Sequence, residues 1–346
     1  MTDDILLAAH HVDVVYDTGE GTPTHAVRDV AVELRRGELL GIAGESGCGK
    51  STLAYALTRL LQPPARLAAG TVTLDGQDLY ALDREALRAV RWTRLSMVFQ
   101  SAMNALNPVT TVGRQFDDIF RAHRPAMTAT ERRAKAGELL DMVGIDPSRL
   151  RSHPHELSGG MRQRVVIAMA LALDPDVVVM DEPTTALDVV VQREILDEIE
   201  ELRERLGFAV IFITHDLNLL LEISDRLAVM YAGRIVEYAD TARIAEGGAL
   251  HPYTRGLLRS FPALTGDRRD LRGIPGQPPD LRLATPGCAF ADRCEAVVER
   301  CRAQRPELER VGEGLSWAAC HVARHHPSDR QAVPTESAGQ TRGGPA

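Results

Sequence analysis

The sequence predicts an α/β fold whose core is a parallel sheet. Two apolar, β-branched runs, 177–180 and 209–214, bracket a charged stretch, 191–206, whose apolar residues recur at helical spacing. Strand–helix–strand alternation of this kind is what a parallel sheet requires. A third apolar run, 38–43, indicates a buried strand, and glycine-rich sequence and a helical pattern, 51–61, follow it directly. Together these runs predict the core of the fold.

Further β-rich stretches lie nearer the N-terminus. Residues 5–16 and 26–34 are separated by a turn-like segment. Residues 71–80 indicate a strand pair joined by a turn at Asp75-Gly76. These stretches predict additional short strands outside the parallel core.

A long helical region separates the two halves of the predicted core. From about 84 to 173 the pattern is helical, with breaks at 107–108, around Pro125 and at 153–154. Its nine-residue apolar run, Val165 to Leu173, is the longest in the chain. A membrane span needs about 20 apolar residues, so this run indicates a buried helix segment.

Composition narrows the classes of function. The chain has 346 residues, 44% of them hydrophobic, and a net charge of −8, which gives no sign of an electrostatic nucleic-acid binder. The N-terminus has two acids where a secretory signal would have basic residues. We therefore expect a cytosolic protein that reaches any membrane through a partner.

A phosphate-binding loop follows the 38–43 strand. Residues 44–51 fit all eight positions of G-x-x-x-x-G-K-[ST] between a predicted strand and a helix, which disfavours a plain flexible turn. Glycines let backbone N–H groups face phosphates, and the helix N-terminus adds positive potential. Lys50 would reach the β- and γ-phosphates, and the Ser51 hydroxyl would ligate Mg²⁺. The loop predicts MgATP binding by Gly44, Ser46, Gly47, Cys48, Gly49, Lys50, Ser51 and Thr52.

An acidic pair, Asp181-Glu182, ends the 177–180 run. Carboxylates at the end of a parallel strand face the same crevice as the phosphate loop. Asp181 would hold the metal through its water shell, and Glu182 would polarise the attacking water. Alone, the pair is equally well explained as a plain strand end; the phosphate loop favours the catalytic interpretation.

Between these elements, Leu157-Ser-Gly-Gly-Met-Arg-Gln-Arg164 opens a predicted helix. Ser158, Gly159 and Gly160 make a second phosphate-binding edge there. The motif resembles the signature of ATP-binding cassette (ABC) ATPases, whereas a serine cap with a glycine turn explains only the helix start. The resemblance implies that this edge covers ATP bound to the opposite subunit, so that ATP closes a dimer and hydrolysis reopens it. Met161 stands where the family most often has glutamine, but the serine and glycines remain.

Other residues resemble functional positions of the same family. Gln100, which ends the strand-like run LSMVFQ, resembles the glutamine that senses metal and water, and Asp188 resembles the loop that crosses the dimer interface. His215 resembles the histidine that contacts the γ-phosphate, and Tyr16 the aromatic residue that stacks on adenine. In isolation, His215 reads as a strand-end histidine and Tyr16 as a core aromatic. The implied catalytic residues are Glu182, His215 and Gln100, with Ser51 and Gln100 at Mg²⁺.

The resemblance narrows further to one type of importer subunit. The segment 101–113, the signature LSGGMRQRV and His251-Pro-Tyr253-Thr together resemble the D-type ATPase of oligopeptide, dipeptide and nickel importers, over about 5–325. This implies a heterodimer with a homologous ATPase subunit at the cytoplasmic face of the membrane. Two permeases and an extracytoplasmic binding protein complete the implied assembly, in which segment 101–113 belongs to the subdomain that receives the permease's coupling helix. Peptides are the expected cargo and nickel is the alternative.

The same resemblance implies a domain organisation. We expect a P-loop ATPase domain over 1–262, with a RecA-like core, an antiparallel β subdomain and a helical subdomain at about 92–172. A small loop-rich extension with four cysteines, 263–325, would follow. The tail, 326–346, is rich in proline, serine, glycine and threonine, which is typical of disorder.

Four of the five cysteines crowd into the last sixth of the chain, with the spacing C-x5-C-x6-C-x18-C. In a reducing cytosol such a cluster indicates a metal site sooner than disulfides. Four thiolates suit zinc or an iron–sulfur cluster, and the lack of C-x2-C pairs weakens zinc. The resemblance favours a [4Fe–4S] cluster; free structural thiols are the alternative. The residues concerned are Cys288, Cys294, Cys301 and Cys320. His321 is a possible substitute ligand, with a solvent-exposed side chain as the alternative, while Cys48 fits a small residue tolerated in the phosphate loop.

Two other classes of function compete with a transport motor. One is a non-transport ABC protein acting on ribosomes or DNA, and the other is a nucleotide-binding regulator whose partner performs most of the hydrolysis. The chain has neither the long coiled coils of DNA-repair relatives nor the second cassette of ribosomal ones. An ATP-hydrolysing transport subunit is therefore the preferred hypothesis.

Overall fold

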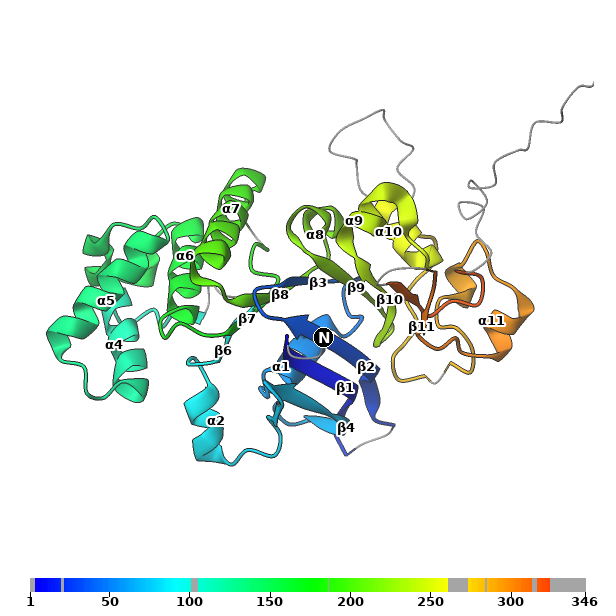
Figure 1. Cartoon of the computed structure of the whole chain (residues 1–346), viewed down its shortest axis with the longest axis horizontal. Helices are drawn as coiled ribbons and strands as arrows, with labels where there is room; N and C mark the ends of the chain where they lie inside the picture. The colour runs from blue at the N-terminus through cyan, green and yellow to red at the C-terminus, as the bar shows by residue number, and fades with distance from the viewer. Residues whose placement is uncertain are drawn as a thin grey trace, which may run out of the picture.

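A sheet of eight strands forms the centre of the computed structural model, which describes residues 4–19, 22–100, 105–185, 187–260, 273–283, 285–312 and 316–323. The strand order is β11-β12-β10-β9-β3-β8-β7-β6. In Figure 1 the strand labels follow this order from β10, on the right, to β6, on the left. Its parallel strands are β3 (Leu39–Ala43), β6 (Leu95–Val98), β7 (Val177–Asp181), β8 (Ala209–Thr214) and β9 (Arg226–Tyr231). Its antiparallel strands are β10 (Arg234–Asp240), β11 (Glu309–Arg310) and β12 (Ser316–Ala318).

The register of the parallel strands brings three strand ends to one edge of this sheet. Ala43 pairs with Thr214, and Asp181 pairs with Ile213. The residues that follow β3, β7 and β8 therefore lie beside one another, as expected where parallel strands end together. These residues are the phosphate loop, Glu182 and His215.

A second, antiparallel sheet covers one face of the core. Its order is β2-β1-β4-β5, with β1 (Ile5–Tyr16), β2 (Thr24–Arg35), β4 (Ala65–Leu74) and β5 (Gln77–Asp78). Helix α1 (Lys50–Leu57) packs in the same hydrophobic cluster, between β1, β2 and β4 on one side and β7 on the other. Alternate residues of the core strands, such as Ile42 and Val179, point into this cluster because successive side chains of a strand face opposite sides.

The other face is covered by helices and joins a separate helical lobe. The lobe contains α4 (Val112–His123), α5 (Ala129–Met142), η1 (Pro147–Arg151), η2 (Pro154–Glu156) and α6 (Gly159–Ala170), and α2 (Arg84–Val90) precedes it. Helix α4 buries Val112, Phe116 and Phe120 in a second hydrophobic cluster, which lies on this helical face of the core sheet. The remaining elements are α7 (Val189–Leu206), α8 (Leu217–Ile223), α9 (Thr241–Arg243), η3 (Ile244–Gly248), α10 (Pro252–Ser260), η4 (Ala291–Arg293) and α11 (Glu299–Ala303).

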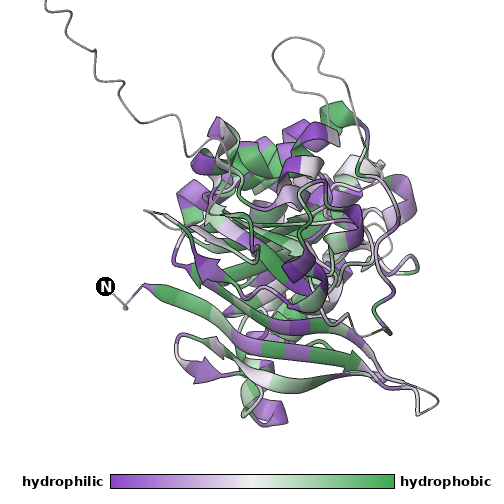
Figure 2. Cartoon of the chain, turned by 90° about the vertical axis from the view of Figure 1, so that its right-hand side faces the viewer, coloured by the Kyte–Doolittle hydropathy of each residue, from purple (hydrophilic) through white to green (hydrophobic). Residues whose placement is uncertain are grey.

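Hydropathy follows this layering. In Figure 2 the strands carry long hydrophobic stretches, whereas hydrophilic residues gather on helices and loops at the surface. Among the described residues, no helix combines the length and apolar character that crossing a membrane would require.

The structure confirms the predicted strands of the core and departs from the prediction in three places. Helix α1 stops at Leu57, short of the predicted 61, because Arg59 adopts a left-handed φ of 51°. Strand β6 matches the strand-like run that Gln100 ends, within the otherwise helical region. Strands β9 and β10 were not predicted, and the loop-rich extension contributes β11 and β12 to the core sheet. The predicted disordered tail, 326–346, and residues 101–104 lie outside the described residues.

Candidate functional site

Glycines shape the phosphate loop between β3 and α1. Gly44, Gly47 and Gly49 have positive φ angles of 156°, 78° and 107°. A Cβ atom on Gly44 would lie 2.3 Å from the Met230 carbonyl oxygen, and one on Gly49 would lie 2.2 Å from that of Ala26. Larger residues would clash there, so the sequence folds into a cradle where backbone N–H groups can meet an anion.

The Lys50 side chain is folded back onto this loop. Its Nζ donates hydrogen bonds to the carbonyl oxygens of Gly44, at 2.7 Å, and Glu45, at 3.0 Å, and the side chain is buried. An ammonium group has three donors, and its hydrogen bonds to ionised oxygens are the stronger ones. Lys50 can therefore exchange these carbonyls for phosphate oxygens.

Ser51 and Asp181 meet across the end of the sheet. Ser51 Oγ donates a hydrogen bond of 3.1 Å to Asp181 Oδ1. Asp181 is fully buried, and its Oδ2 has no hydrogen-bond partner among the described residues. Burial raises the pKa of the Asp181 carboxyl, with the Ser51 hydrogen bond opposing that shift. Hydroxyl and carboxylate oxygens are donors that a hard cation such as Mg²⁺ prefers, so this pair fits a magnesium site.

Glu182 is the centre of a polar network. Its Oε2 accepts hydrogen bonds from Gln100 Nε2, at 2.9 Å, and Thr185 Oγ1, at 3.0 Å, and its Oε1 lies 3.4 Å from His215 Nδ1. Burial alone raises the pKa of Glu182, but the hydrogen bonds from Thr185 and Gln100, together with His215, outweigh it and lower the pKa below its ordinary value. The carboxylate therefore stays ionised, which is the form that can polarise a water molecule.

The backbone at Glu182 is also unusual. Its φ of 46° lies in the left-handed region, which a residue other than glycine occupies at some cost. This conformation turns the chain sharply at the end of β7, and the Glu182 N–H donates to the Ile213 carbonyl oxygen at 2.8 Å. Strained backbone of this kind concentrates at functional sites.

Tyr16 lies at the end of β1, beside the phosphate loop. Its hydroxyl oxygen is 3.0 Å from Thr52 Oγ1, and its ring is partly buried against the cluster that contains α1. The sequence prediction placed both residues at the nucleotide site, and the structure brings them together.

The serine–glycine edge lies elsewhere on the chain. Ser158 Oγ accepts a hydrogen bond of 3.3 Å from the Met161 N–H and caps α6, and Asp188 caps α7 in the same way, at 3.0 Å from the Val191 N–H. Both caps line one open cavity of about 560 Å³, together with Gly159 and Gly160. No residue of the described loop 44–52 lines that cavity. The two glycine-rich helix starts are therefore separate sites within one chain.

The sequence did not single out three side chains near the phosphate loop, those of Thr185, Glu45 and Arg293. Thr185 hydrogen-bonds to Glu182, and its only signal was a polar side chain just after the acidic pair. Glu45 accepts a bidentate ion pair from Arg293, and its backbone N–H donates to the Tyr253 hydroxyl oxygen at 2.8 Å. Glu45 occupies a variable position of the loop motif, so the motif itself did not single it out.

The four C-terminal cysteines lie in one neighbourhood. The thiols of Cys288, Cys294 and Cys320 all interact electrostatically with Cys301, and Cys288 and Cys320 also interact with Cys294. Burial raises the pKa of all three, to about 11 for Cys288. Within the ranges that the structure describes, no group of three or more His, Cys, Asp or Glu side chains is arranged around a single metal position.

His321 is directed to a backbone oxygen instead. Its Nε2 lies 2.8 Å from the Gln304 carbonyl oxygen. Cys48, the fifth cysteine, is buried in the phosphate loop, and burial raises the pKa of its thiol. A buried thiol with a raised pKa is poorly reactive, which agrees with a residue tolerated for its size.

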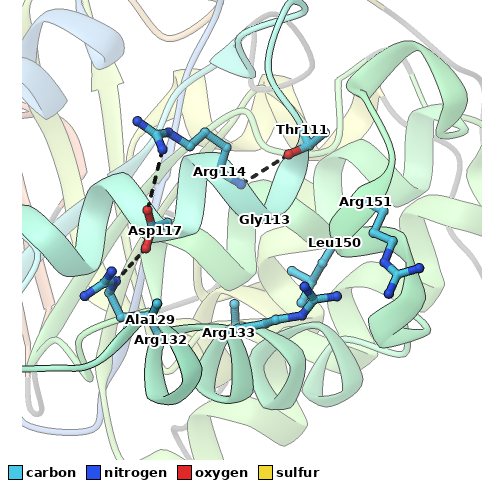
Figure 3. Close-up of a pocket in the computed structure, with 10 residues that line it drawn as sticks. Thr111, Gly113, Arg114, Asp117, Ala129, Arg132, Arg133, Leu150 and Arg151 are labelled. Atoms are coloured by element: carbon cyan, nitrogen blue, oxygen red, sulfur yellow. Dashed lines mark hydrogen bonds and ion pairs between the residues drawn. The ribbon is translucent and has the colours of Figure 1, made fainter.

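A further cavity, of about 360 Å³, lies in the helical lobe between α4, α5 and η1 (Figure 3). Asp117 lies in its lining and accepts a hydrogen bond of 2.5 Å from Arg132 Nε. Arg133 and Arg151 also line it, and neither has an ion-pair partner among the described residues. The cavity is thus basic, and it is separate from the phosphate loop.

Two family models match the chain. The model described as ABC transporter matches residues 27–185, and the model described as the C-terminal region of oligopeptide/dipeptide transporters matches residues 236–301. The second match covers most of β10, the whole of α10 and three of the four clustered cysteines.

Two curated relatives match over most of their length. The chain is 40% identical over 319 residues to the dipeptide transport ATP-binding protein DppD of Caldanaerobacter subterraneus, covering 92% of this chain and 97% of the relative. It is 44% identical over 321 residues to a probable peptide ABC transporter ATP-binding protein of Sinorhizobium fredii, covering 92% and 95%.

Solved structures share the architecture. A dimeric bacterial ABC transporter cassette matches with a TM-score of 0.61 and 30% identity, over 68% of this chain and 99% of that one. A second structure of that cassette, in a post-hydrolysis state bound to ADP and Pi, gives the same TM-score.

Proposed function

The chain belongs to the ABC transporter family, and from that premise we propose which residues carry its ATP hydrolysis and what the hydrolysis drives. It is an ATPase subunit with the α/β fold of an ABC cassette, and it works with the permease components of a peptide importer. We propose oligopeptides or dipeptides as cargo, because the C-terminal family match and both relatives above concern peptide transport.

One observation carries the proposed mechanism: Lys50, the Ser51–Asp181 pair and the Glu182 network share one edge of the sheet. We propose that Lys50 and the loop backbone bind the phosphates and that Ser51 and Asp181 hold Mg²⁺. The ion would neutralise charge on the triphosphate when bound. Glu182 would orient and polarise the attacking water.

Three further residues complete the proposed ATP site. Gln100 hydrogen-bonds to Glu182, where it would sense the metal. His215 lies 3.4 Å from Glu182, where it would contact the γ-phosphate. Tyr16 would stack on the adenine ring, beside Thr52.

The serine–glycine edge supports action in a dimer. Ser158, Gly159, Gly160 and Asp188 line a cavity that contains no phosphate-loop residue of the same chain. The first turn of α7, next to this cavity, exposes Val189 and Val190 by 81% and 69%, as a surface that a partner would cover. We propose that the edge closes over ATP held by a homologous ATPase subunit, and that the two subunits form a heterodimer.

The helical lobe is the proposed contact with the permease, at the cytoplasmic face of the membrane. The cavity of Figure 3 is lined by Thr111 and Gly113, which belong to the segment 101–113 that follows Gln100. Arg133 and Arg151 have no ion-pair partner in the described part of the chain, so they suit an acidic side chain on the permease. An extracytoplasmic binding protein would act through the permeases.

For the four clustered cysteines we propose a [4Fe–4S] cluster. The thiols interact with one another, yet no three described donors surround a single metal position. Four neighbouring thiols are the ligand set that a [4Fe–4S] cluster uses, and the sequence lacks the C-x2-C pairs of the usual zinc sites. The raised pKa values mean that loading would release protons from the thiols.

Uptake by cells tests the proposed cargo. Cells that depend on this subunit would take up labelled dipeptides and oligopeptides, and the Glu182→Gln variant would abolish that uptake. Loss of labelled nickel uptake with normal peptide uptake would reject the peptide assignment in favour of nickel. Normal uptake of both would reject transport.

A further inference from the structure

Arg293 of the cysteine-bearing extension makes a bidentate ion pair with Glu45 of the phosphate loop. The Nη1–Oε2 and Nη2–Oε1 distances are 2.7 and 2.9 Å. The Arg293 side chain is 6% exposed and that of Glu45 is 26% exposed. Two parallel hydrogen bonds between a guanidinium and a carboxylate fix relative orientation as well as distance.

The guanidinium itself is held from several sides. Arg293 Nε donates to the Pro275 carbonyl oxygen at 2.8 Å, and Nη1 lies 3.2 Å from the Tyr231 hydroxyl oxygen. The guanidinium carbon also lies 5.8 Å from the centre of the Tyr231 ring and 5.9 Å from that of Phe290. This buried aromatic setting makes Arg293 a rigid support.

Glu45 is tied down through its backbone as well. Its N–H donates to the Tyr253 hydroxyl oxygen at 2.8 Å, and its carbonyl oxygen accepts from Lys50 Nζ at 3.0 Å. Its side chain is therefore the link between the extension and the loop segment that holds Lys50 in place.

Two of the four clustered cysteines bound the turn that carries Arg293. The Ala291 N–H donates to the Cys288 carbonyl oxygen at 3.0 Å, and the Cys294 N–H donates to the Ala291 carbonyl oxygen at 3.3 Å. Cys294 follows Arg293 directly in the sequence, so a change at the cysteine site can reach the ion pair through one peptide bond.

We infer that Arg293 is a positioning residue of the ATP site, which acts through Glu45 to hold the phosphate loop and to neutralise a carboxylate beside the bound triphosphate. Without Arg293, the Glu45 carboxylate would stand unpaired next to the polyphosphate and repel it. The extension thereby sets the ATP affinity of its own subunit. This inference rests on the phosphate loop being the ATP site, which Lys50→Ala tests separately.

The test compares ATP binding and steady-state hydrolysis in full-length variants. In Arg293→Met we expect Kd and KM for ATP to rise about tenfold while kcat changes less, because the lost interaction acts on binding. In Glu45→Gln/Arg293→Met, which lacks both charges, we expect KM to return to within about threefold of wild type, since contacting residues are not additive. Arg302→Met is the matched control: it breaks an exposed ion pair with Asp292 in the same extension and should leave both constants unchanged.

A wild-type KM in Arg293→Met would overturn the inference. A double variant as weak as the single one would overturn the part of it that assigns charge neutralisation to Arg293. If Arg293→Met does not fold, hydrogen exchange on Arg293→Lys decides the question. We expect faster exchange at residues 44–49 than in wild type with α5 unaffected, and unchanged exchange at 44–49 would refute the link. Normal ATP binding by Lys50→Ala would instead refute the site assignment itself.

Discussion

Ser51 Oγ donates a hydrogen bond to Asp181 Oδ1 across 130 residues of sequence, while Asp181 Oδ2 is buried without a partner in the described part of the chain. A buried carboxylate oxygen without a partner is costly, so such atoms are generally satisfied by another group. A metal-bound water would satisfy this oxygen and lower the cost of burial. The pair thus ties the loop at the start of α1 to the acidic end of β7.

Removing the Lys50 ammonium should abolish ATP turnover. Lys50→Ala deletes the charged donor that now contacts Gly44 and Glu45, and we expect kcat/KM for ATP to fall about 10²-fold or more. A coupled phosphate-release assay measures this. Lys135→Ala, which removes the chain's other lysine, in α5, is the control. Near wild-type activity in Lys50→Ala would contradict the proposed ATP site.

Stacking of adenine on Tyr16 predicts different results for two substitutions. Tyr16→Ala removes the ring, and we expect KM for ATP to rise about tenfold, the typical scale of base–aromatic stacking. Tyr16→Phe removes only the hydroxyl that contacts Thr52 and should change KM little. Equal KM values for Tyr16→Ala and wild type would show that the ring is a core aromatic only.

The hydrogen bond from Thr185 to Glu182 predicts a change in the pH profile. The bond stabilises the ionised carboxylate and contributes to a pKa below the ordinary value. The base therefore stays active until the pH falls through that lowered pKa. In Thr185→Val the pKa should rise, so the acid limb of kcat should move to higher pH. Thr130→Val, on α5, is the control and should leave the acid limb in place. A wild-type acid limb in Thr185→Val would show that the limb does not report the ionisation of Glu182.

The cysteine cluster predicts a definite metal content. Protein purified without oxygen should contain about four iron and four acid-labile sulfide per chain, and Cys301→Ser should lose most of both. Cys48→Ser, at the buried cysteine of the phosphate loop, should keep them. One zinc per chain in place of iron would refute the cluster, and no metal at all would favour free thiols.

The core and the edge that carries the site were predictable because their signals are local. The motif 44–51 and the acidic pair after β7 each mark a strand end, and parallel strands bring such ends together. Strands β9 and β10 were missed although they are joined by a turn at Ala232-Gly233, whose φ angles of 48° and 81° are typical of a tight hairpin. In β10, Arg234, Glu237 and Asp240 interrupt the apolar pattern.

The contact between the extension and the phosphate loop could not be predicted from the sequence. Glu45 and Arg293 are 248 residues apart, and neither stands in a pattern that names the other. Their contact depends on how β12 adds to β10 and on the packing of Phe290 against Tyr231 and Tyr253. Such long-range packing has no local sequence signal, so only the structure reveals it.

The central claim is that one subunit binds the triphosphate while the serine–glycine edge of its neighbour covers it. An ATP-bound structure of the Glu182→Gln variant in its assembly tests this most directly, because that variant should keep ATP unhydrolysed and the dimer closed. We predict the N–H groups of residues 158–160 within hydrogen-bond distance of a γ-phosphate held by the partner's phosphate loop. A structure in which residues 158–160 contact no triphosphate, in either subunit, would contradict the account.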